Sequence, residues 1–386
     1  MKKHFETEAI HTEFYNENNA INNPLYLTSS FYFNTIKSAD DAFSFKTNDY
    51  VYTRGNNPTI RELEKTVSIL EKGEDSVAFS SGMGAISGVL MSLLEHGDSI
   101  LAHTNIYGSS HSFIKEILPK YGIDVTFGDL KNISNIKNKK YKVVFFETPT
   151  NPSLELIDIE KVSEYFSNST IVVDNTFSSP YLQNPLDYGA DIVLHSATKY
   201  LSGHGDVLGG TVTSKDKDYI NKLKFGTLCE YGSVISPFNA WLILRGLKTL
   251  HLRMERHCLN AEKIVEFLSQ RKEVEKIYYP GFEGENADVL KKQMRGSGGI
   301  LSFEISGEID RSIKFVNSLK LLKISVSLGD TETLIQIPSM MTHRSFLNED
   351  LEKFGFKNKT IRISAGLENY EDIIFDLERG FKNIEQ

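Results

Sequence analysis

Short, wholly apolar runs alternate with segments of helical spacing through the middle of this 386-residue chain. Runs without polar alternation are typical of strands buried on both faces of a parallel sheet. The helical segments between them supply the crossover connections that parallel strands require. We therefore predict an α/β fold with a large, mostly parallel sheet. The predicted strands cover 77–79, 98–102, 141–146, 171–173 and 191–194, and the predicted helices cover 82–94, 113–121 and 159–166.

The pattern changes after a long helix that begins at Ser236-Pro237, where serine is a good N-cap and proline suits the first helical position. We expect this helix to run through Trp241 and Leu247 toward Arg256. Beyond it, a smaller α+β domain is predicted. Its expected strands are 274–278, 299–305 and 361–363, and its expected helices are 314–319 and 370–381.

The chain is longer than one typical domain, so we expect two domains and an arm. The predicted boundaries are an N-terminal arm at 1–56, a cofactor-binding α/β domain at 57–249 and a C-terminal α+β domain at 250–386. The arm has little periodicity and many Asn, Tyr and Phe residues. Without a core of its own it either moves freely or lies on another subunit, and its aromatic residues favour docking.

Composition narrows the class of protein. The chain is 40% hydrophobic and 24% charged, which are globular values, and its net charge of -8 with no dense basic run argues against a nucleic-acid partner. Cys229 and Cys258 are too few for a disulfide framework, which suits a reducing cytoplasm. No Cys/His spacing indicates a metal site, no signal peptide is visible, and no apolar run approaches the ~20 residues that a membrane span needs.

Five residues with polar or charged side chains fall at the carboxyl ends of the predicted strands or just beyond them: Ser81, Glu147, Asn151, Asp174 and Lys199. Ligands of parallel α/β sheets bind at this edge. Their coincidence is the strongest argument from the residues alone for a functional site.

Lys199 follows the strand at 191–194 and precedes a glycine-rich stretch, 203–210, which we expect to continue neither a helix nor a strand. A lysine at the mouth of an apolar strand is partly desolvated, which favours the nucleophilic neutral amine. With the hydroxyls of Ser196 and Thr198 available for a phosphate, this is the minimum set for a pyridoxal-phosphate Schiff base. From this stretch alone, an ordinary solvated lysine has equal weight.

Four features of the sequence have both a functional and a plain structural interpretation. The turn at Gly82-Met83 opens a helix and could bind an anion, or be a simple tight turn. Asp174 could pair with a protonated ring nitrogen, or cap the next turn. Tyr107 could stack on a planar cofactor and act as an acid or base, or simply pack. Arg362 could bind a substrate carboxylate, or form an internal salt bridge.

Together these motifs resemble the Cys/Met-metabolism family of pyridoxal-phosphate enzymes. The most specific stretch is Ser196-Ala-Thr-Lys-Tyr-Leu-Ser-Gly-His204, and the resemblance extends from Tyr52-Thr53-Arg54 to Arg362. It implies the type I, aspartate-aminotransferase-like fold and a homotetramer, a dimer of dimers with intersubunit active sites.

The resemblance also implies a role for each motif residue. Lys199 would hold the pyridoxal 5'-phosphate covalently and relay protons, while Tyr107 would stack on its ring and help the leaving group depart. Asp174 would pair with the ring nitrogen. The phosphate would be held by Gly82, Met83, Ser196 and Thr198, with Tyr52 and Arg54 reaching it from a neighbouring subunit. The substrate carboxylate would be bound by Asn151, Ser327 and Arg362.

Within the family, the stretches 327–334 and Met341-Thr342-His343 look most like methionine γ-lyases. Val326 stands where cystathionine enzymes usually carry Glu, and an apolar residue there favours a thioether tail. Two places depart from the lyase pattern: Ser109 replaces a Cys, and Leu228-Cys229 replaces a Lys-Asp pair.

The resemblance therefore implies a pyridoxal-phosphate carbon–sulfur lyase that performs α,γ-elimination on a sulfur amino acid. The products would be a 2-oxo acid, ammonia and a thiol. An O-acetylhomoserine sulfhydrylase, which performs γ-replacement, and a cystathionine γ-lyase are the alternatives within the family. From other classes, a cofactor-binding regulator with little turnover and a nicotinamide oxidoreductase stay open.

Overall fold

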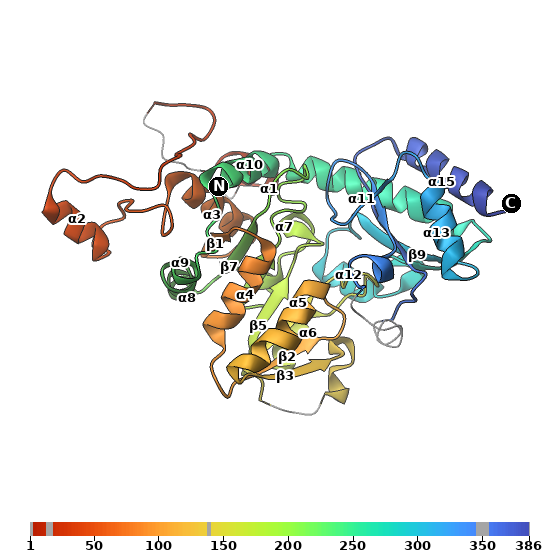
Figure 1. Ribbon diagram of the computed structural model, residues 1–386, viewed down its shortest axis with the longest axis horizontal. Helices are drawn as coiled ribbons and strands as arrows, with labels where there is room; N and C mark the ends of the chain where they lie inside the picture. Colours follow the sequence, from red (N-terminus) through yellow and green to blue (C-terminus); the bar gives the residue numbers. More distant parts are fainter. Residues whose placement is uncertain (1–2, 13–17, 137–139, 345–354, 386) are drawn as a thin grey trace.

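A computed structural model describes residues 3–12, 18–136, 140–344 and 355–385 (Figure 1). Within these ranges, a seven-stranded sheet has the order β1-β7-β6-β5-β4-β2-β3. The strands β3, β2, β4, β5 and β6 are parallel neighbours, and β7 pairs antiparallel with both β6 and β1. The prediction of a mostly parallel sheet is confirmed. The bounds are β1 (Asp75–Phe79), β2 (Ser99–His103), β3 (Asp124–Gly128), β4 (Val143–Glu147), β5 (Thr170–Asp174), β6 (Ile192–His195) and β7 (Gly210–Ser214).

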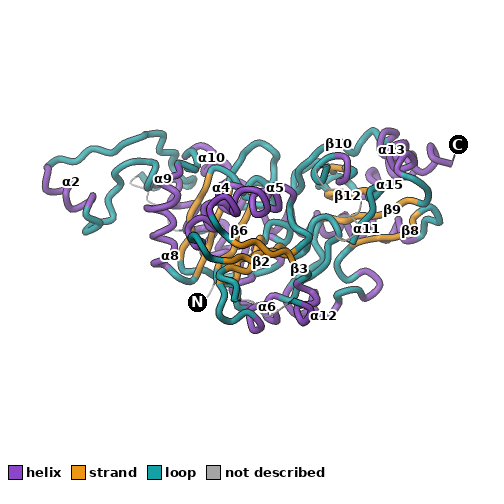
Figure 2. Tube along the Cα trace, turned by 60° about the horizontal axis from the view of Figure 1, so that its bottom comes forward, coloured by secondary structure: helices purple, strands orange, loops and turns teal. Residues whose placement is uncertain are grey.

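Helices cover both faces of this sheet, as Figure 2 also shows. On one face α3 (Pro58–Leu70) and α10 (Pro237–Leu247) share a core with Ala78 and Ala197. On the other face α4 (Gly82–Leu93) packs its apolar residues against β1 and β6. The remaining helical segments of this part are α5 (Gly108–Ser112), continued to Tyr121 by tighter and wider turns, α6 (Ile159–Tyr165), α7 (Ser179–Leu182), α8 (Lys217–Lys222) and α9 (Cys229–Tyr231).

Two local predictions were wrong. The glycine-rich stretch does begin a strand, since β7 starts at Gly210, which pairs with Phe79. A Cβ on Gly210 would lie 2.2 Å from the carbonyl oxygen of Ser81, so only glycine lets the turn before α4 cross this strand. The helix expected to reach Arg256 is two helices, α10 and α11 (Leu250–Ser269), because the carbonyl of Gly246 accepts bonds from the Thr249 N–H and from Arg253.

A second, smaller sheet has the order β10-β11-β12-β9-β8 within the described ranges. Its strands are β8 (Val274–Tyr278), β9 (Ile300–Ile305), β10 (Lys323–Ile324), β11 (Leu334–Gln336) and β12 (Ile361–Ser364). Together with α11, α13 (Ile309–Ser318) and α15 (Tyr370–Glu385) it encloses a separate apolar core. The short helix α12 (Ala287–Gln293) lies between β8 and β9 in the sequence and hydrogen-bonds to the first domain through Gln293.

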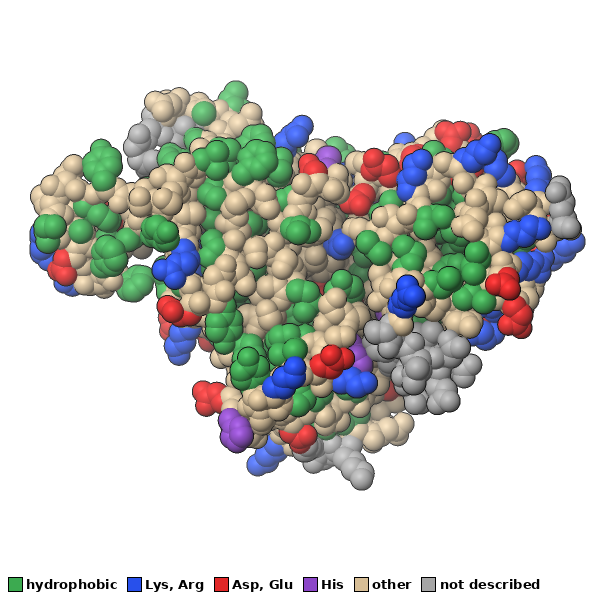
Figure 3. Space-filling model, in the orientation of Figure 1, with side chains coloured by type: hydrophobic (Ala, Val, Ile, Leu, Met, Phe, Trp, Pro, Cys, Tyr) green, Lys and Arg blue, Asp and Glu red, His purple; other side chains and the backbone are tan. Residues whose placement is uncertain are grey.

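The N-terminal segment leaves the body of the molecule. The helix α1 (Phe5–Ile10) docks on the chain itself through Phe5 and Ala9, whereas α2 (Ile36–Phe43) stands away from the sheet in Figure 1. Large apolar side chains gather on this arm, as the space-filling view shows (Figure 3). The most exposed are Ile21, Leu27, Tyr32, Ile36, Phe43 and Phe45, at 68–92%.

Candidate active site

Charged side chains close adjacent parallel strands of the large sheet. Glu147 is the last residue of β4 and Asp174 the last residue of β5, and the two are register partners. His195 ends β6, directly before Ser196. The carboxyl ends of these strands therefore meet at one edge, as the sequence predicts.

The Lys199 amine lies half-buried in the turn after β6 and donates a 2.7 Å hydrogen bond to the hydroxyl of Ser327. Burial, aided by the positive charge of Arg362 and opposed by the negative charge of Asp330, lowers the pKa of Lys199 to about 8. Near neutral pH a useful fraction of this amine is therefore unprotonated and can attack a carbonyl. The interpretation of Lys199 as an ordinary solvated lysine does not fit this environment.

Arg362 lies in β12 with 3% of its surface exposed and is held by neutral partners. Its guanidinium donates to Asn151 Oδ1 at 3.0 Å and to the carbonyl of Ser327 at 2.8 Å. With its amide oxygen facing Arg362, Gln336 accepts from Nε at 2.9 Å, a role that no sequence pattern indicates. No carboxylate of the described residues forms an ion pair with Arg362, so its charge remains available for an anion such as a substrate carboxylate.

The start of α4 faces Ser196. The Ser81 hydroxyl caps the helix by accepting from the Gly84 N–H at 3.0 Å, and the first amides, those of Gly82 and Met83, have no partner within the helix. A Cβ on Gly82 would lie 2.8 Å from that of Ser196, so glycine permits this close approach. The Thr198 hydroxyl is engaged with the backbone of Gly209. This edge could receive a phosphate.

Asp174 is buried with no cationic side chain bonded to it in the described chain. Its Oδ1 accepts from the N–H and the hydroxyl of Thr176, at 3.0 and 2.5 Å. Burial raises the pKa of Asp174, opposed by the Thr176 bonds and by the charge of His195. A buried carboxylate without a counterion suits a protonated ring nitrogen.

The sequence places Glu147 at a strand end near the site but does not indicate what it does there. Its carboxylate accepts a hydrogen bond from the backbone N–H of Tyr107. Burial raises the pKa of Glu147 well above its ordinary value, and the charge of Asp174 raises it further. Glu147 therefore anchors the backbone of Tyr107, whose ring is 39% exposed and free to stack on a ligand.

Tyr52 and Arg54 are not brought to this cluster. Arg54 donates to the carbonyl of Cys229 at 3.1 Å, and neither side chain hydrogen-bonds to Gly82, Met83, Ser196, Thr198 or Lys199 in the described chain. Both line a separate cavity of about 690 Å³ beside the arm. Within one chain, Tyr52 and Arg54 therefore do not bond to the predicted phosphate site, and their predicted role requires a neighbouring subunit.

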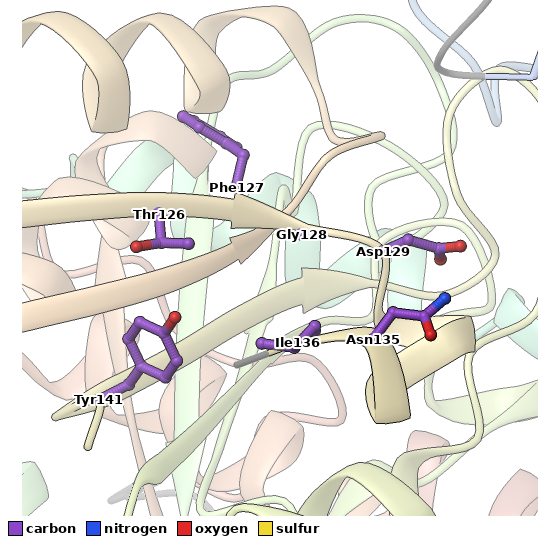
Figure 4. A pocket seen from close by; sticks show the side chains of 7 residues that line it. All are labelled: Thr126, Phe127, Gly128, Asp129, Asn135, Ile136 and Tyr141. Atoms are coloured by element: carbon purple, nitrogen blue, oxygen red, sulfur yellow. The ribbon is translucent and has the colours of Figure 1, made fainter. Parts of the chain in front are cut away.

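A further cavity of about 380 Å³ lies at the carboxyl end of β3 (Figure 4). Phe127 points away from Tyr141 there, and Asp129 and Asn135 lie at one end. It is lined by none of the predicted site residues. Among the described residues no group of three metal-ligating side chains occurs, and no helix has the length and apolar character needed to cross a bilayer.

The positions thought to shape substrate choice have diverse environments. Ser109 and Val326 are exposed, Val326 at 51%, whereas Leu228 is buried. Cys229 is half-buried and its thiol lies 3.5 Å from the carbonyl of Arg54. Burial raises the pKa of Cys229, which makes it a poor nucleophile.

The residues present fit pyridoxal 5'-phosphate. The chain offers a desolvated amine, a buried carboxylate lacking a counterion, an exposed aromatic ring and unpaired helix amides, all from the same edge of the sheet. Nearby, Arg362 offers a free charge for the carboxylate of an amino acid.

Comparison with known proteins gives consistent results. The family model described as "Cys/Met metabolism PLP-dependent enzyme" matches residues 6–382. An L-methionine gamma-lyase of Fusobacterium nucleatum subsp. polymorphum is 44% identical over 369 residues, covering 94% of this chain and 93% of that protein. The cystathionine gamma-lyase of Lactobacillus plantarum, solved with L-serine, superposes with a TM-score of 0.93 at 37% identity, covering 99% of this chain and 100% of the other. A putative O-acetylhomoserine (thiol)-lyase of Campylobacter jejuni, solved with N'-pyridoxyl-lysine-5'-monophosphate, also has a TM-score of 0.93, at 29% identity, covering 98% and 99%.

Proposed function

We propose, from the premise that this chain belongs to the Cys/Met metabolism family of pyridoxal-phosphate-dependent enzymes, that it is a carbon–sulfur lyase of the methionine γ-lyase type. It removes the sulfur group from a sulfur amino acid by α,γ-elimination and, consuming one water molecule, releases a 2-oxo acid, ammonia and a thiol. The observation that carries this proposal is the Lys199 amine, which lies beside Ser327, next to the guanidinium of Arg362.

Cofactor binding follows from the residues at the strand ends. Lys199 holds the coenzyme covalently, Asp174 pairs with its ring nitrogen, and Tyr107 stacks on its ring. The phosphate is held by Gly82, Met83, Ser196 and Thr198, with Tyr52 and Arg54 of a second copy. When bound, the coenzyme supplies an electron-withdrawing ring that stabilises negative charge on the amino acid's carbon skeleton.

Substrate binding and proton transfer fall to a second set of residues. Arg362 binds the amino acid carboxylate through its planar fork, while Asn151 and Ser327 orient it. Lys199 takes the proton from Cα and returns it elsewhere, because its lowered pKa lets it hold and release a proton near neutral pH. The Tyr107 hydroxyl donates a proton to the departing sulfur. The exposed apolar Val326 favours an uncharged thioether tail.

The chain works as a homotetramer, a dimer of dimers. Support comes from the arm, where large apolar side chains are exposed, and from the placement of Tyr52 and Arg54 in a cavity beside it. Its two free cysteines suit a reducing cytoplasm. Light scattering on the purified protein should give the mass of four chains.

An O-acetylhomoserine sulfhydrylase and a cystathionine γ-lyase are the other candidates, because Ser109, Leu228 and Cys229 depart from the methionine γ-lyase pattern. A panel of methionine, homocysteine, cystathionine, cysteine and O-acetylhomoserine separates the candidates. Release of 2-oxobutanoate and methanethiol from methionine supports the proposal. Thioether formation from O-acetylhomoserine plus a thiol, without elimination from methionine, would defeat it, as would turnover of cystathionine alone.

A further inference from the structure

One hydroxyl joins two parts of the site that belong to different strands. The side chain of Thr176 donates a 2.5 Å hydrogen bond to Asp174 Oδ1 and accepts one of 2.8 Å from the backbone N–H of Ser196. This hydroxyl thus uses its one donor for Asp174 and one of its two acceptor lone pairs for Ser196. The backbone N–H of Thr176 adds a 3.0 Å bond to the same carboxylate oxygen.

The two groups that Thr176 connects have different tasks. Asp174 ends β5 and, in the proposed function, would pair with the ring nitrogen of the coenzyme, whereas Ser196 follows β6 and would help to hold its phosphate. Both Thr176 bonds to the carboxylate go to Oδ1, so Oδ2 is the oxygen left for the ring nitrogen. The hydroxyl therefore fixes both the rotation of the carboxylate and its position relative to the phosphate turn.

Charge also depends on these bonds. Burial raises the pKa of Asp174, and the Thr176 side chain is the first of the groups that oppose this, ahead of the Thr176 N–H and His195. On the other side, Glu147 faces Asp174 from β4. Without the hydroxyl, the pKa of Asp174 should rise and a larger fraction of its carboxyl should be protonated. A neutral carboxyl cannot form an ion pair with a cationic ring nitrogen.

We propose that Thr176 is a positioning residue for the cofactor, holding the Asp174 carboxylate at a fixed place relative to the phosphate-binding turn at Ser196. This inference rests on the proposed function, because it concerns the same cofactor. It goes beyond that function by assigning a role to a residue that neither the sequence nor the family motif residues marked.

The test compares Thr176→Val, which keeps the shape but removes the hydroxyl, with Thr176→Ser, which keeps the hydroxyl. Ser178→Ala is the matched control, since it removes a buried hydroxyl from the same turn that bonds only to the carbonyl of Thr148. The readouts are the dissociation constant of pyridoxal 5'-phosphate from the full chain and the visible circular dichroism of the bound coenzyme. Thr176→Val should weaken binding roughly tenfold or more and reduce the dichroic band, as loss of a hydrogen bond to a charged group implies. Thr176→Ser and Ser178→Ala should resemble wild type.

Equal binding and equal dichroism in Thr176→Val and wild type would overturn the proposal, and so would a Thr176→Ser protein as impaired as Thr176→Val. Should Thr176→Val fail to fold, Thr176→Ala removes the same hydroxyl and must show the same loss, again reversed in Thr176→Ser. A wild-type protein that takes up no coenzyme would instead contradict the proposed function. Failure of the Thr176 role leaves wild-type binding intact, so the two failures are distinct.

Discussion

The hydroxyl of Ser327 accepts a 2.7 Å hydrogen bond from the amine of Lys199, 128 residues earlier in the chain. The carbonyl of Ser327 accepts from Arg362, so one residue of the smaller domain touches both the amine and the guanidinium. Its φ of 84° is left-handed, a conformation that costs a non-glycine residue on the order of 1–3 kcal/mol and clusters at functional sites. The contact joins the proposed cofactor lysine to the proposed carboxylate site.

The pKa of Lys199 sets how fast the cofactor-free protein takes up pyridoxal 5'-phosphate. Only the neutral amine attacks the aldehyde, so the uptake rate should rise with pH, reach half its maximum near pH 8, where Lys199 titrates, and level off above it. Stopped-flow absorbance over pH 6–10 measures this profile. Arg362→Gln removes a charge that lowers the pKa of Lys199 and should shift the plateau to higher pH. A rate that keeps rising past pH 10 would show a solvated lysine instead.

Replacing Arg362 with lysine keeps the charge but removes the planar fork that bonds Asn151 and Ser327. KM for the amino acid should rise roughly a hundredfold, the equivalent of about 3 kcal/mol for a buried charge-assisted pair. Cofactor absorbance should be retained, because Arg362 is proposed to bind the substrate and not the coenzyme. Steady-state kinetics with an unchanged KM would remove Arg362 from the carboxylate site.

The role of Glu147 as an anchor for Tyr107 can be tested through the oxygen atom that accepts the Tyr107 N–H. Glu147→Gln keeps an oxygen that accepts from the Tyr107 N–H, whereas Glu147→Ala leaves that N–H unpaired. We expect Glu147→Gln to stay within about tenfold of wild-type kcat/KM and Glu147→Ala to lose far more, since an unpaired buried donor costs about 1–3 kcal/mol and releases the loop. If kcat/KM of Glu147→Gln falls as far as that of Glu147→Ala, activity depends on the titratable carboxyl of Glu147 and not on its hydrogen bond to the Tyr107 N–H.

Subunit mixing tests the intersubunit phosphate site. Arg54→Ala should weaken cofactor retention, and Lys199→Ala should abolish turnover. In a mixed dimer, one site combines the intact Lys199 of one chain with the intact Arg54 of the other. Unfolding and refolding equal amounts of the two variants together should therefore make about a quarter of all sites intact in both residues, by random assortment, and restore activity in that proportion. No recovery above that of either variant alone would place Arg54 in its own chain's site.

Three buried histidines make stability depend on pH. Burial lowers the pKa of His103, His257 and His343 to about 4, below the ordinary 6.5. Because the unfolded chain binds protons more tightly between these values, the free energy of unfolding should fall as pH drops from about 6.5 to 4, by on the order of 3 kcal/mol per histidine.

The difference between wild type and His257→Asn in denaturant titrations isolates this effect from Glu147 and Asp174, whose raised pKa values act in the opposite direction. The variant should lose stability less steeply than wild type below pH 6.5. Parallel curves for the two proteins would show that His257 is not buried in its neutral form.

The sequence alone predicted the parallel sheet and the gathering of Glu147, Asp174 and Lys199 at its edge, because uniformly apolar strands and their polar end residues are local patterns. It could not predict that Gly210 starts a strand, since that depends on the crossing turn at Ser81. Thr176 gave no signal either, because a threonine in a turn is common. Its meaning comes from Ser196 on the neighbouring strand, and such a contact is visible only in three dimensions.

Borohydride reduction of the cofactor-loaded protein, followed by peptide mapping, tests the central claim most directly, because it fixes the carbon–nitrogen double bond wherever that bond has formed. The account predicts one coenzyme adduct, on the peptide that contains Lys199, and no adduct in Lys199→Ala. An adduct on another lysine, or a Lys199→Ala protein that turns over its substrate at the wild-type rate, would contradict it.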